Sequence, residues 1–209
     1  MEKQETRIIG VTGGVGSGKS AILSYLEQHY RCKVLLADLV AKQMQEPGSA
    51  CFEQLVSLLG EDILEQTGQI QKDKMAEKIF HDGNLLRQVN ELIHPAVIAY
   101  ILDQIREIKE SGCYDFFFIE AALLIETGFD KICDELWYIY AREDVRRTRL
   151  KASRGYGDEK ITAIMKKQLS EEDFRKHCDV VIDNSDTLGK SYEQIDRILE
   201  GYLWHRYRI

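Results

Sequence analysis

Eight residues near the start of the chain have the types and spacing needed to hold a chain of phosphates. They are Gly13-Gly14-Val15-Gly16-Ser17-Gly18-Lys19-Ser20, which fit the pattern G-x-x-x-x-G-K-S/T and follow an apolar run at residues 8–11. In such a loop the backbone N–H groups point inward, and Lys19 can reach the β- and γ-phosphates. The Ser20 hydroxyl can bind Mg²⁺, and the N–H groups of Ser20 and Ala21 add the positive end of a helix. Glycine-rich turns also close ordinary βα units, but the flanking strand and helix patterns favour a nucleoside triphosphate site.

Two acidic residues stand where parallel strands are expected to end. Asp38 follows the apolar run 34–37, and Glu120 follows the run 116–119. The carboxyl ends of parallel strands share one edge of the sheet with the phosphate loop. Asp38 could therefore orient an acceptor hydroxyl and take its proton, and Glu120 could hold Mg²⁺. The alternatives are that Asp38 caps a helix over residues 39–45 and that Glu120 is a structural carboxylate.

A cluster of cations follows the predicted strand at residues 136–140. Six of the residues between positions 142 and 154 are Arg or Lys, and they fall on two adjacent helical faces. Some of them could simply face solvent, but their mutual repulsion favours an anionic ligand, and arginine suits a phosphate in transfer. Arg149 and Arg154 are the expected functional pair because, among these arginines, they lie furthest from the strand and next to the turn at residues 155–157, which could hinge a lid.

Two further polar residues could contact ligands. His94 precedes Pro95 at the expected start of a long helix. Asn184 lies in the polar turn that follows the apolar run 180–182, at the same sheet edge as the phosphate loop. Asn184 could read the edge of an adenine base, although a turn is the ordinary role of such an Asn. His94 could equally be a helix cap, and Glu126 could position a substrate loop.

The elements that must hold these residues alternate between strand and helix patterns. Strands are predicted at residues 8–12, 33–37, 116–120, 136–140 and 180–182, which indicates βαβ units and a five-stranded parallel sheet. Between the second and third strands lie about 75 residues with almost only helical periodicity, typical of an inserted substrate-binding subdomain. The fold class is therefore α/β, with a helical insertion and a helical lid.

The net charge and the cysteine content of the chain limit the ligands and compartments that can be expected. The 209 residues carry a formal net charge of −7, which argues against general affinity for nucleic acid or an anionic membrane. The five cysteines are widely spaced without a C-x-x-C pair, so we expect reduced thiols in a cytoplasmic protein. Residues 1–5 lack the apolar core of a signal peptide. The oligomeric state is open, with a monomer favoured.

A phosphate loop by itself does not separate a GTPase, a motor ATPase and a small-molecule kinase. The guanine-reading pattern Asn-Lys-x-Asp is absent, and the helical insertion and the arginine cluster favour a kinase. Beyond this, residues 8 to about 199 resemble the dephospho-CoA kinase family. The segments that carry the resemblance are residues 11–20, Ala37-Asp38 with Glu46-Pro47-Gly48, residues 85–98 with Asn90 and His94-Pro95, residues 123–126, the arginine segment with Gln168 downstream, and residues 179–184.

The resemblance implies a P-loop NTPase core at residues 1–40, 115–145 and 178–209, a CoA-binding insertion at 41–114 and a lid at 146–177. It implies that ATP, with Mg²⁺, phosphorylates the ribose 3′-hydroxyl of dephospho-CoA. The expected catalytic residues are Asp38 as base, Lys19, Arg149 and Arg154. The expected acceptor contacts are Asp38, His94, Leu123 and Glu126.

Three positions depart from the family's usual pattern. Leu36 replaces an aspartate, Ala122 replaces a proline, and Arg149 and Arg154 are five positions apart instead of four. Two rival functions stay open: a kinase for a nucleoside or nucleoside monophosphate, and a nucleotide sensor without transfer, which the missing aspartate at position 36 supports best.

Overall fold

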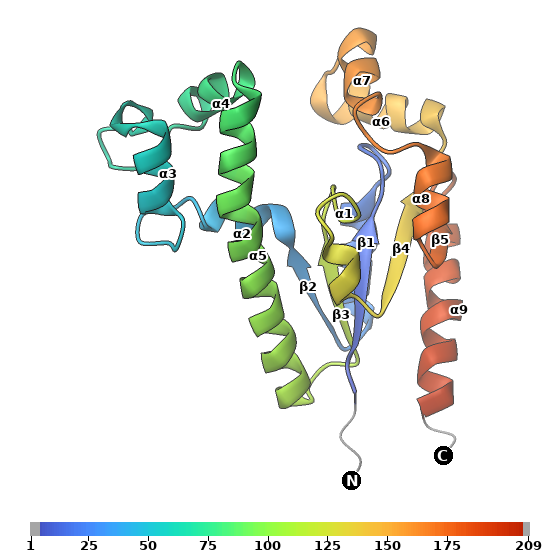
Figure 1. Ribbon diagram of the computed structural model, residues 1–209. Coiled ribbons are helices and arrows are strands. Elements are labelled where there is room, and N and C mark those ends of the chain that lie inside the picture. Colours follow the sequence, from blue (N-terminus) through green and yellow to red (C-terminus); the bar gives the residue numbers. More distant parts are fainter. Residues whose placement is uncertain (1–4, 207–209) are drawn as a thin grey trace. The chain divides into compact units, whose positions relative to one another are not determined.

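A five-stranded parallel sheet is the centre of the fold, as the sequence predicted. The computed structural model describes residues 5–206, and Figure 1 shows the strands side by side. The strand order is β2-β3-β1-β4-β5. The strands are β1 (Arg7–Thr12), β2 (Cys32–Leu36), β3 (Phe116–Glu120), β4 (Glu135–Tyr140) and β5 (Val180–Asp183).

The central strand β1 is buried because it has a neighbour on each side. Ile9 pairs with Phe118 of β3 and with Glu135 of β4, and Val11 pairs with Glu120 and Trp137. The two β1 residues are completely inaccessible to solvent. Near-continuous apolar runs are typical of parallel strands that are covered on both faces. All three paired strands run in the same direction, so the loop that follows β1 leaves from the edge where β3 and β4 also end.

The chain divides into two compact units, one formed by the residues up to Leu35 and from Ser111 onward, the other by Leu36–Glu110. The helices of the first unit are α1 (Lys19–His29), α6 (Glu143–Arg154), α7 (Asp158–Met165), α8 (Glu171–His177) and α9 (Leu188–Arg206), with a short 3₁₀ turn η2 (Phe129–Ile132). In that unit α1 packs on α9: the ring of Tyr25 stacks on Tyr192 at 3.8 Å, and Tyr25 and Tyr30 both donate to Asp196.

The second unit is helical. It contains α2 (Ala37–Gln43), α3 (Phe52–Leu59), the 3₁₀ turn η1 (Glu61–Ile63), α4 (Lys72–Phe80) and most of α5 (Gly83–Ser111). Its core includes the fully buried side chains of Leu55 and Ile63 and the nearly buried Val89.

The start of the long helix differs from the sequence expectation. We expected Pro95 to open it, but α5 begins twelve residues earlier, at Gly83, and Pro95 lies inside it. The reason is a better N-terminal cap: Asp82 Oδ1 accepts hydrogen bonds from the backbone N–H groups of Asn84 at 2.9 Å and Leu85 at 3.0 Å. Pro95 is exposed, so water can satisfy the carbonyl that its missing N–H leaves without a partner.

Candidate functional site

The phosphate loop occupies the turn between β1 and α1. Gly13, Gly16 and Gly18 have φ values of 151°, 79° and 90°, which only glycine adopts without strain. A side chain at position 13 would also strike the carbonyl oxygen of Ile139 on β4. The helix α1 begins at Lys19 with no side-chain cap, so its first N–H groups point toward the loop. Loop and helix together form the concave array of donors that binds an anion.

Asn184 and Arg149 hold the loop from the side of β5 and α6. The Nδ2 atom of Asn184 donates to the carbonyl oxygen of Ser17 at 2.7 Å, and Nη1 of Arg149 donates to the same oxygen at 3.2 Å. Nη2 of Arg149 donates to the carbonyl oxygen of Asn184 at 2.8 Å. The Asn184 side chain is fully buried, and its Oδ1 accepts from Ser191 Oγ at 2.9 Å. Both ends of the Asn184 amide are therefore engaged inside the protein, and the adenine contact stays a prediction.

Arg146 and Gln168 hold the other end of the loop. Nε of Arg146 donates to the carbonyl oxygen of Val15 at 2.9 Å, and its Nη2 donates to Gln168 Oε1 at 3.1 Å. The same Oε1 accepts from the backbone N–H of Val15 at 3.0 Å. Burial lowers the pKa of the Arg146 guanidinium from its ordinary value, but arginine stays charged in proteins. Arg146 therefore places a positive charge against the loop.

Lys19 and Glu120 lie within reach of one another. Nζ of Lys19 donates to the carbonyl oxygen of Gly13 at 2.8 Å and lies 3.6 Å from Glu120 Oε1. Both side chains are only 14% exposed. The Ser20 side chain is exposed, and the N–H of Ala21 bonds to the carbonyl oxygen of Gly18 at 3.1 Å. The carboxylate of β3 is thus next to the lysine that is expected to bind phosphates.

Asp38 belongs to the second unit and lies in the first turn of α2. The expected helix start at residue 39 is wrong, because α2 begins at Ala37. Its N-cap is Leu36, with no side-chain cap, so the alternative that Asp38 caps this helix is not supported. The Asp38 side chain is exposed.

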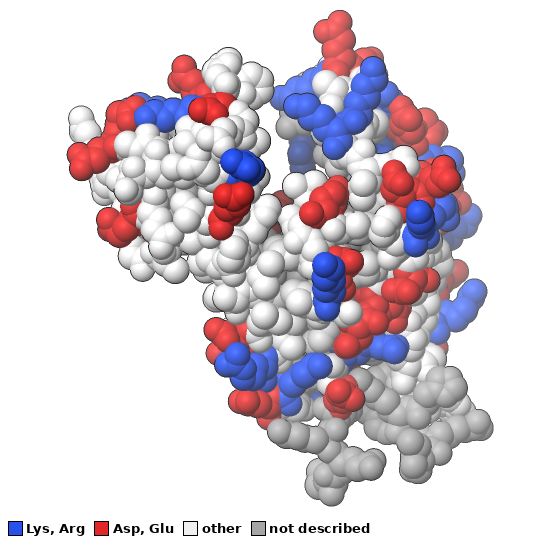
Figure 2. All heavy atoms as spheres, viewed as in Figure 1, with Lys and Arg blue, Asp and Glu red and all other residues white. Residues whose placement is uncertain are grey.

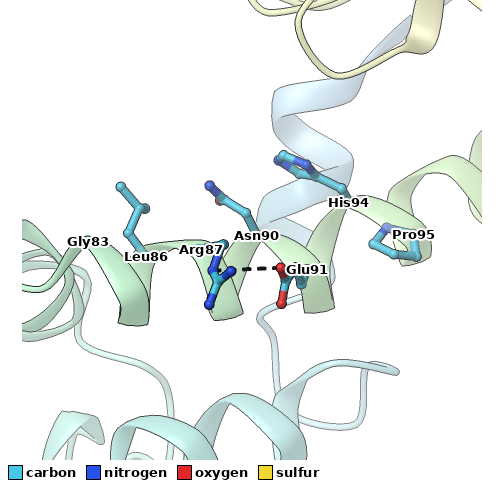
Figure 3. A pocket seen from close by; sticks show the side chains of 7 residues that line it. All are labelled: Gly83, Leu86, Arg87, Asn90, Glu91, His94 and Pro95. Atoms are coloured by element: carbon cyan, nitrogen blue, oxygen red, sulfur yellow. Dashed lines mark ion pairs between the residues drawn. The ribbon is translucent and has the colours of Figure 1, made fainter.

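His94 lines a pocket of about 480 Å³ on the first half of α5. Figure 3 shows Leu86, Asn90 and His94 rising from the same side of the helix, as their four-residue spacing requires. On its rim Arg87 and Glu91 form an ion pair at 3.9 Å. Hydrogen-bonding, charged and apolar groups thus meet in one open pocket of the second unit.

The remaining sequence-predicted residues lie in the first unit. Leu123 and Glu126 are exposed in the turn that follows β3, where Thr127 Oγ1 donates to the Leu123 carbonyl oxygen at 2.7 Å. Arg154 is exposed at the end of α6, with its guanidinium 5.9 Å from the ring of Tyr156. Of the two arginines that were expected to act as a pair, Arg149 contacts the phosphate loop. The ring contact of Arg154 is with Tyr156, two residues further along the chain. Figure 2 shows blue side chains gathered over the part of the first unit that α6 and α7 form.

The comparisons with known proteins identify the family of this chain. The sequence model of the family described as dephospho-CoA kinase matches residues 7–190. The chain belongs to the dephospho-CoA kinase family. It is 33% identical to the dephospho-CoA kinase of Carboxydothermus hydrogenoformans over 94% of this chain and 95% of the relative. It is 34% identical to that of Fusobacterium nucleatum over 92% of this chain and 97% of the relative.

Solved structures show the same fold. A Thermus thermophilus structure, titled TT1252, is 26% identical and has a TM-score of 0.80 over 94% of this chain and 98% of that one. The dephospho-CoA kinase from Campylobacter jejuni has a TM-score of 0.70 over 93% of this chain and 98% of that one, at 20% identity. Family membership confirms the predicted resemblance, the α/β P-loop fold and the enzyme class, a kinase.

Sequence reasoning did not select Arg146 as a functional residue of this dephospho-CoA kinase family member, and it assigned no role to Gln168. Arg146 lies three positions before Arg149, so the two share a helical face, and that spacing was the available signal. Gln168 was named only within the resemblance. Its position against Val15 depends on the path of the chain between α7 and α8, which local sequence does not reveal.

Residues 5–206 contain no cluster of three or more His, Cys, Asp or Glu side chains that could hold a metal ion. In the same part of the chain, no helix is both long enough and apolar enough to cross a bilayer.

Proposed function

We propose that this chain transfers the γ-phosphoryl group of ATP to the ribose 3′-hydroxyl of dephospho-CoA, giving coenzyme A and ADP. The observation that carries this proposal is a phosphate loop with two arginines bonded to its carbonyl groups, in a member of the dephospho-CoA kinase family. The reaction completes coenzyme A biosynthesis. The new bond joins the acceptor oxygen to the γ-phosphorus, and the bond between that phosphorus and the β,γ-bridging oxygen breaks.

The donor side of the reaction uses residues 13–21. The loop N–H groups hold the phosphates of ATP, and Lys19 moves its ammonium group from the Gly13 carbonyl oxygen to the β- and γ-phosphate oxygens. The lysine is mobile enough for this because its four-carbon stem has free rotation. The partly buried Glu120 keeps the ammonium group near the loop until the nucleotide binds.

Mg²⁺ fits the donor set. The Ser20 hydroxyl and the Glu120 carboxylate are oxygen ligands of the kind that this ion prefers, and it commonly keeps several waters and phosphate oxygens as its other ligands. When bound, the ion supplies positive charge that neutralises the phosphate oxygens.

The lid arginines stabilise the charge of the transferring group. Arg149 and Arg146 already bond to loop carbonyl oxygens, so their guanidinium groups are held in place before ATP arrives. Fixed positive charge in a partly desolvated site stabilises a transition state better than mobile charge in water does. We assign residues 146–177 as the lid that excludes water, and the role of Arg154 remains a prediction that its variant can test.

On the acceptor side, Asp38 is proposed as the base. Its carboxylate accepts the proton of the 3′-hydroxyl as the new O–P bond forms. His94, in the pocket on α5, and Leu123 and Glu126, in the turn after β3, are proposed to contact dephospho-CoA. The helical residues 41–114 would hold the CoA moiety, and residues 1–40, 115–145 and 178–209 would form the nucleotide-binding core.

The proposed setting is the cytoplasm, with small-molecule substrates and without nucleic-acid or membrane partners. All five cysteines are free thiols, which is usual in a reducing compartment. Burial raises the pKa of Cys133 and Cys178 to about 12, so these two thiols are unreactive near neutral pH.

The deciding experiment measures ADP release from Mg·ATP with dephospho-CoA, AMP, CMP and adenosine as separate acceptors. The mass of each product is checked for one added phosphate. Stimulation by dephospho-CoA alone is the expected result. Stimulation by another acceptor would keep the phosphoryl-transfer mechanism and overturn the substrate, and no stimulation by any of the four would favour a nucleotide sensor.

A further inference from the structure

One side-chain oxygen connects the lid to the phosphate loop. Gln168 Oε1 accepts a hydrogen bond from the backbone N–H of Val15 at 3.0 Å and another from Arg146 Nη2 at 3.1 Å. Arg146 closes the ring by donating from Nε to the Val15 carbonyl oxygen at 2.9 Å. The three residues come from the loop, from α6 and from the connection between α7 and α8, all within the first unit.

The backbone on both sides of Gln168 is firmly held. Its own N–H donates to the Met165 carbonyl oxygen at 3.2 Å, which continues the end of α7. Just after it, Ser170 and Asp173 form a capping box that fixes the start of α8. The ring of Phe174, on the same helix, is buried and stacks on Tyr138 of β4 at 4.7 Å. The glutamine therefore reaches the loop from a fixed position.

The hydrogen-bond acceptor at position 168 is an uncharged amide oxygen, and this affects the charge near the loop. A carboxylate in this position would orient Arg146 equally well, but it would also neutralise the guanidinium that faces the phosphate loop. A glutamine oxygen fixes the direction of Nη2 and leaves the full positive charge available to an anion. The guanidinium lies directly over Gly14, where a Cβ atom would collide with it. Its charge is thus held at the face of the loop.

We propose that Gln168 is a positioning residue for phosphoryl transfer, which sets the place of Arg146 and of the Val15 peptide relative to one another. This rests on the proposed function, because it assigns Arg146 a role toward the transferring phosphate. Gln168 itself touches neither substrate. Its contribution is to hold the cation of Arg146 and the phosphate loop in one fixed geometry.

The test replaces Gln168 by Met, which has similar length but no oxygen acceptor. We expect kcat to fall about tenfold, as for the loss of one hydrogen bond to a charged group, while the KM for the acceptor and the Tm stay close to wild type. Gln168→Asn, which is too short to reach both partners, provides a second variant that keeps the residue polar. Lys167→Gln is the matched control, because that exposed neighbour makes neither contact.

The decisive measurement compares the loss of kcat that Gln168→Met causes in two backgrounds, the wild type and Arg146→Lys. The lysine in Arg146→Lys lacks the two guanidinium nitrogens that bond to Val15 and to Gln168. In that background, Gln168→Met should lower kcat less than about twofold further. Equal losses in both backgrounds would show that Gln168 acts independently of Arg146 and overturn the proposal. An unchanged kcat in Gln168→Met and Gln168→Asn would also overturn it.

Failure of the substrate assignment can be recognised separately. If the wild-type chain does not phosphorylate dephospho-CoA, the same variants are compared in ATP hydrolysis without an acceptor, which needs the same charge stabilisation. A parallel loss of hydrolysis in Gln168→Met would then support the role of Gln168 while the acceptor assignment falls. Full transfer to dephospho-CoA by Gln168→Met would leave the assignment intact and remove the role of Gln168.

Discussion

The Nδ2 atom of Asn184 lies 2.7 Å from the carbonyl oxygen of Ser17, a residue 167 positions earlier in the chain. This buried hydrogen bond ties the connection after β5 to the phosphate loop. Gly18 has no room for a side chain because a Cβ atom there would collide with the same amide nitrogen. The loop is therefore shaped by a residue from the far end of the sequence as well as by its own glycines.

Asn184→Ala should weaken both folding and nucleotide binding. Losing the hydrogen bonds to Ser17 and Ser191 should lower the free energy of unfolding by about 1–3 kcal/mol, measured by urea denaturation. The affinity for an ATP analogue, measured by calorimetry, should also fall. Gln194→Ala is the control, because Gln194 bonds to Asp183 and Lys190 and makes no contact with the loop. An unchanged ATP affinity in Asn184→Ala would refute a role of this amide in shaping the loop.

Arg149→Ala should reduce kcat by about 10³-fold or more, as for loss of an arginine that stabilises phosphoryl transfer. Arg149 bonds to two loop-side carbonyl oxygens, and Arg154 is exposed in its own segment. We therefore expect Arg154→Ala to have a much smaller effect on kcat. Steady-state kinetics of both variants decide the assignment. A loss in Arg154→Ala as large as that in Arg149→Ala would support the pair chosen from sequence.

Asp38→Asn should reduce the rate of phosphoryl transfer by about 10²–10⁴-fold, the usual effect of removing a general base. The amide has the same shape but cannot accept the proton of the acceptor hydroxyl. ATP affinity should change little, since the phosphates are held by the loop and Lys19. The measurement is single-turnover transfer together with ATP-analogue binding. Transfer at close to the wild-type rate would show that Asp38 is not the base.

Gly14→Ala should displace Arg146. The added Cβ atom would lie 2.8 Å from Nη1 of Arg146 and closer still to other guanidinium atoms. We expect kcat to fall by about tenfold, since the guanidinium must leave its place over the loop. The control is Gly201→Ala, because an added Cβ atom at that position in α9 meets nothing within 4 Å. If Gly14→Ala retains full activity, the position of Arg146 over the loop is not needed for transfer.

The capping box of α8 should make this helix sensitive to acid. Hydrogen bonds from the Ser170 side chain and backbone hold the pKa of the Asp173 carboxyl below its ordinary value. The folded state therefore favours the ionised form, and its stabilising effect is present above the unfolded-state pKa of about 3.9. It is lost as the pH falls through the lower pKa of the folded state.

Ser170→Ala removes the hydroxyl partner, so the pKa of Asp173 should rise toward its ordinary value. The measurement is an NMR titration of the Asp173 carboxyl carbon in both proteins. In the variant the stability that Asp173 loses on acidification should be smaller, because the pKa values of the folded and unfolded states lie closer together. Identical titration midpoints would show that Ser170 does not lower this pKa.

Sequence patterns predicted the sheet well because its strands contain short apolar runs, which are almost wholly buried in β1, β3 and β4. They failed at α5, where Pro95 looked like a helix start. Pro is favoured at the first helical position, but an exposed Pro can also lie inside a helix that is well capped elsewhere. The cap at Asp82 and the buried Val89 stabilise the turns that precede the proline, so the helix does not need to begin at Pro95.

The sequence by itself determined the phosphate loop, the order of strands and helices, and the family, because these depend on local pattern and on residue spacing. The tertiary structure decided which cations meet the loop. The arginines of α6 form two adjacent stripes, and only packing selects one of them. Leu150 is 1% exposed and lies against Gly16, so α6 turns Arg146 and Arg149 toward the loop. Gln168 and Asn184 join them because the chain folds back on itself, a relationship that no local spacing encodes.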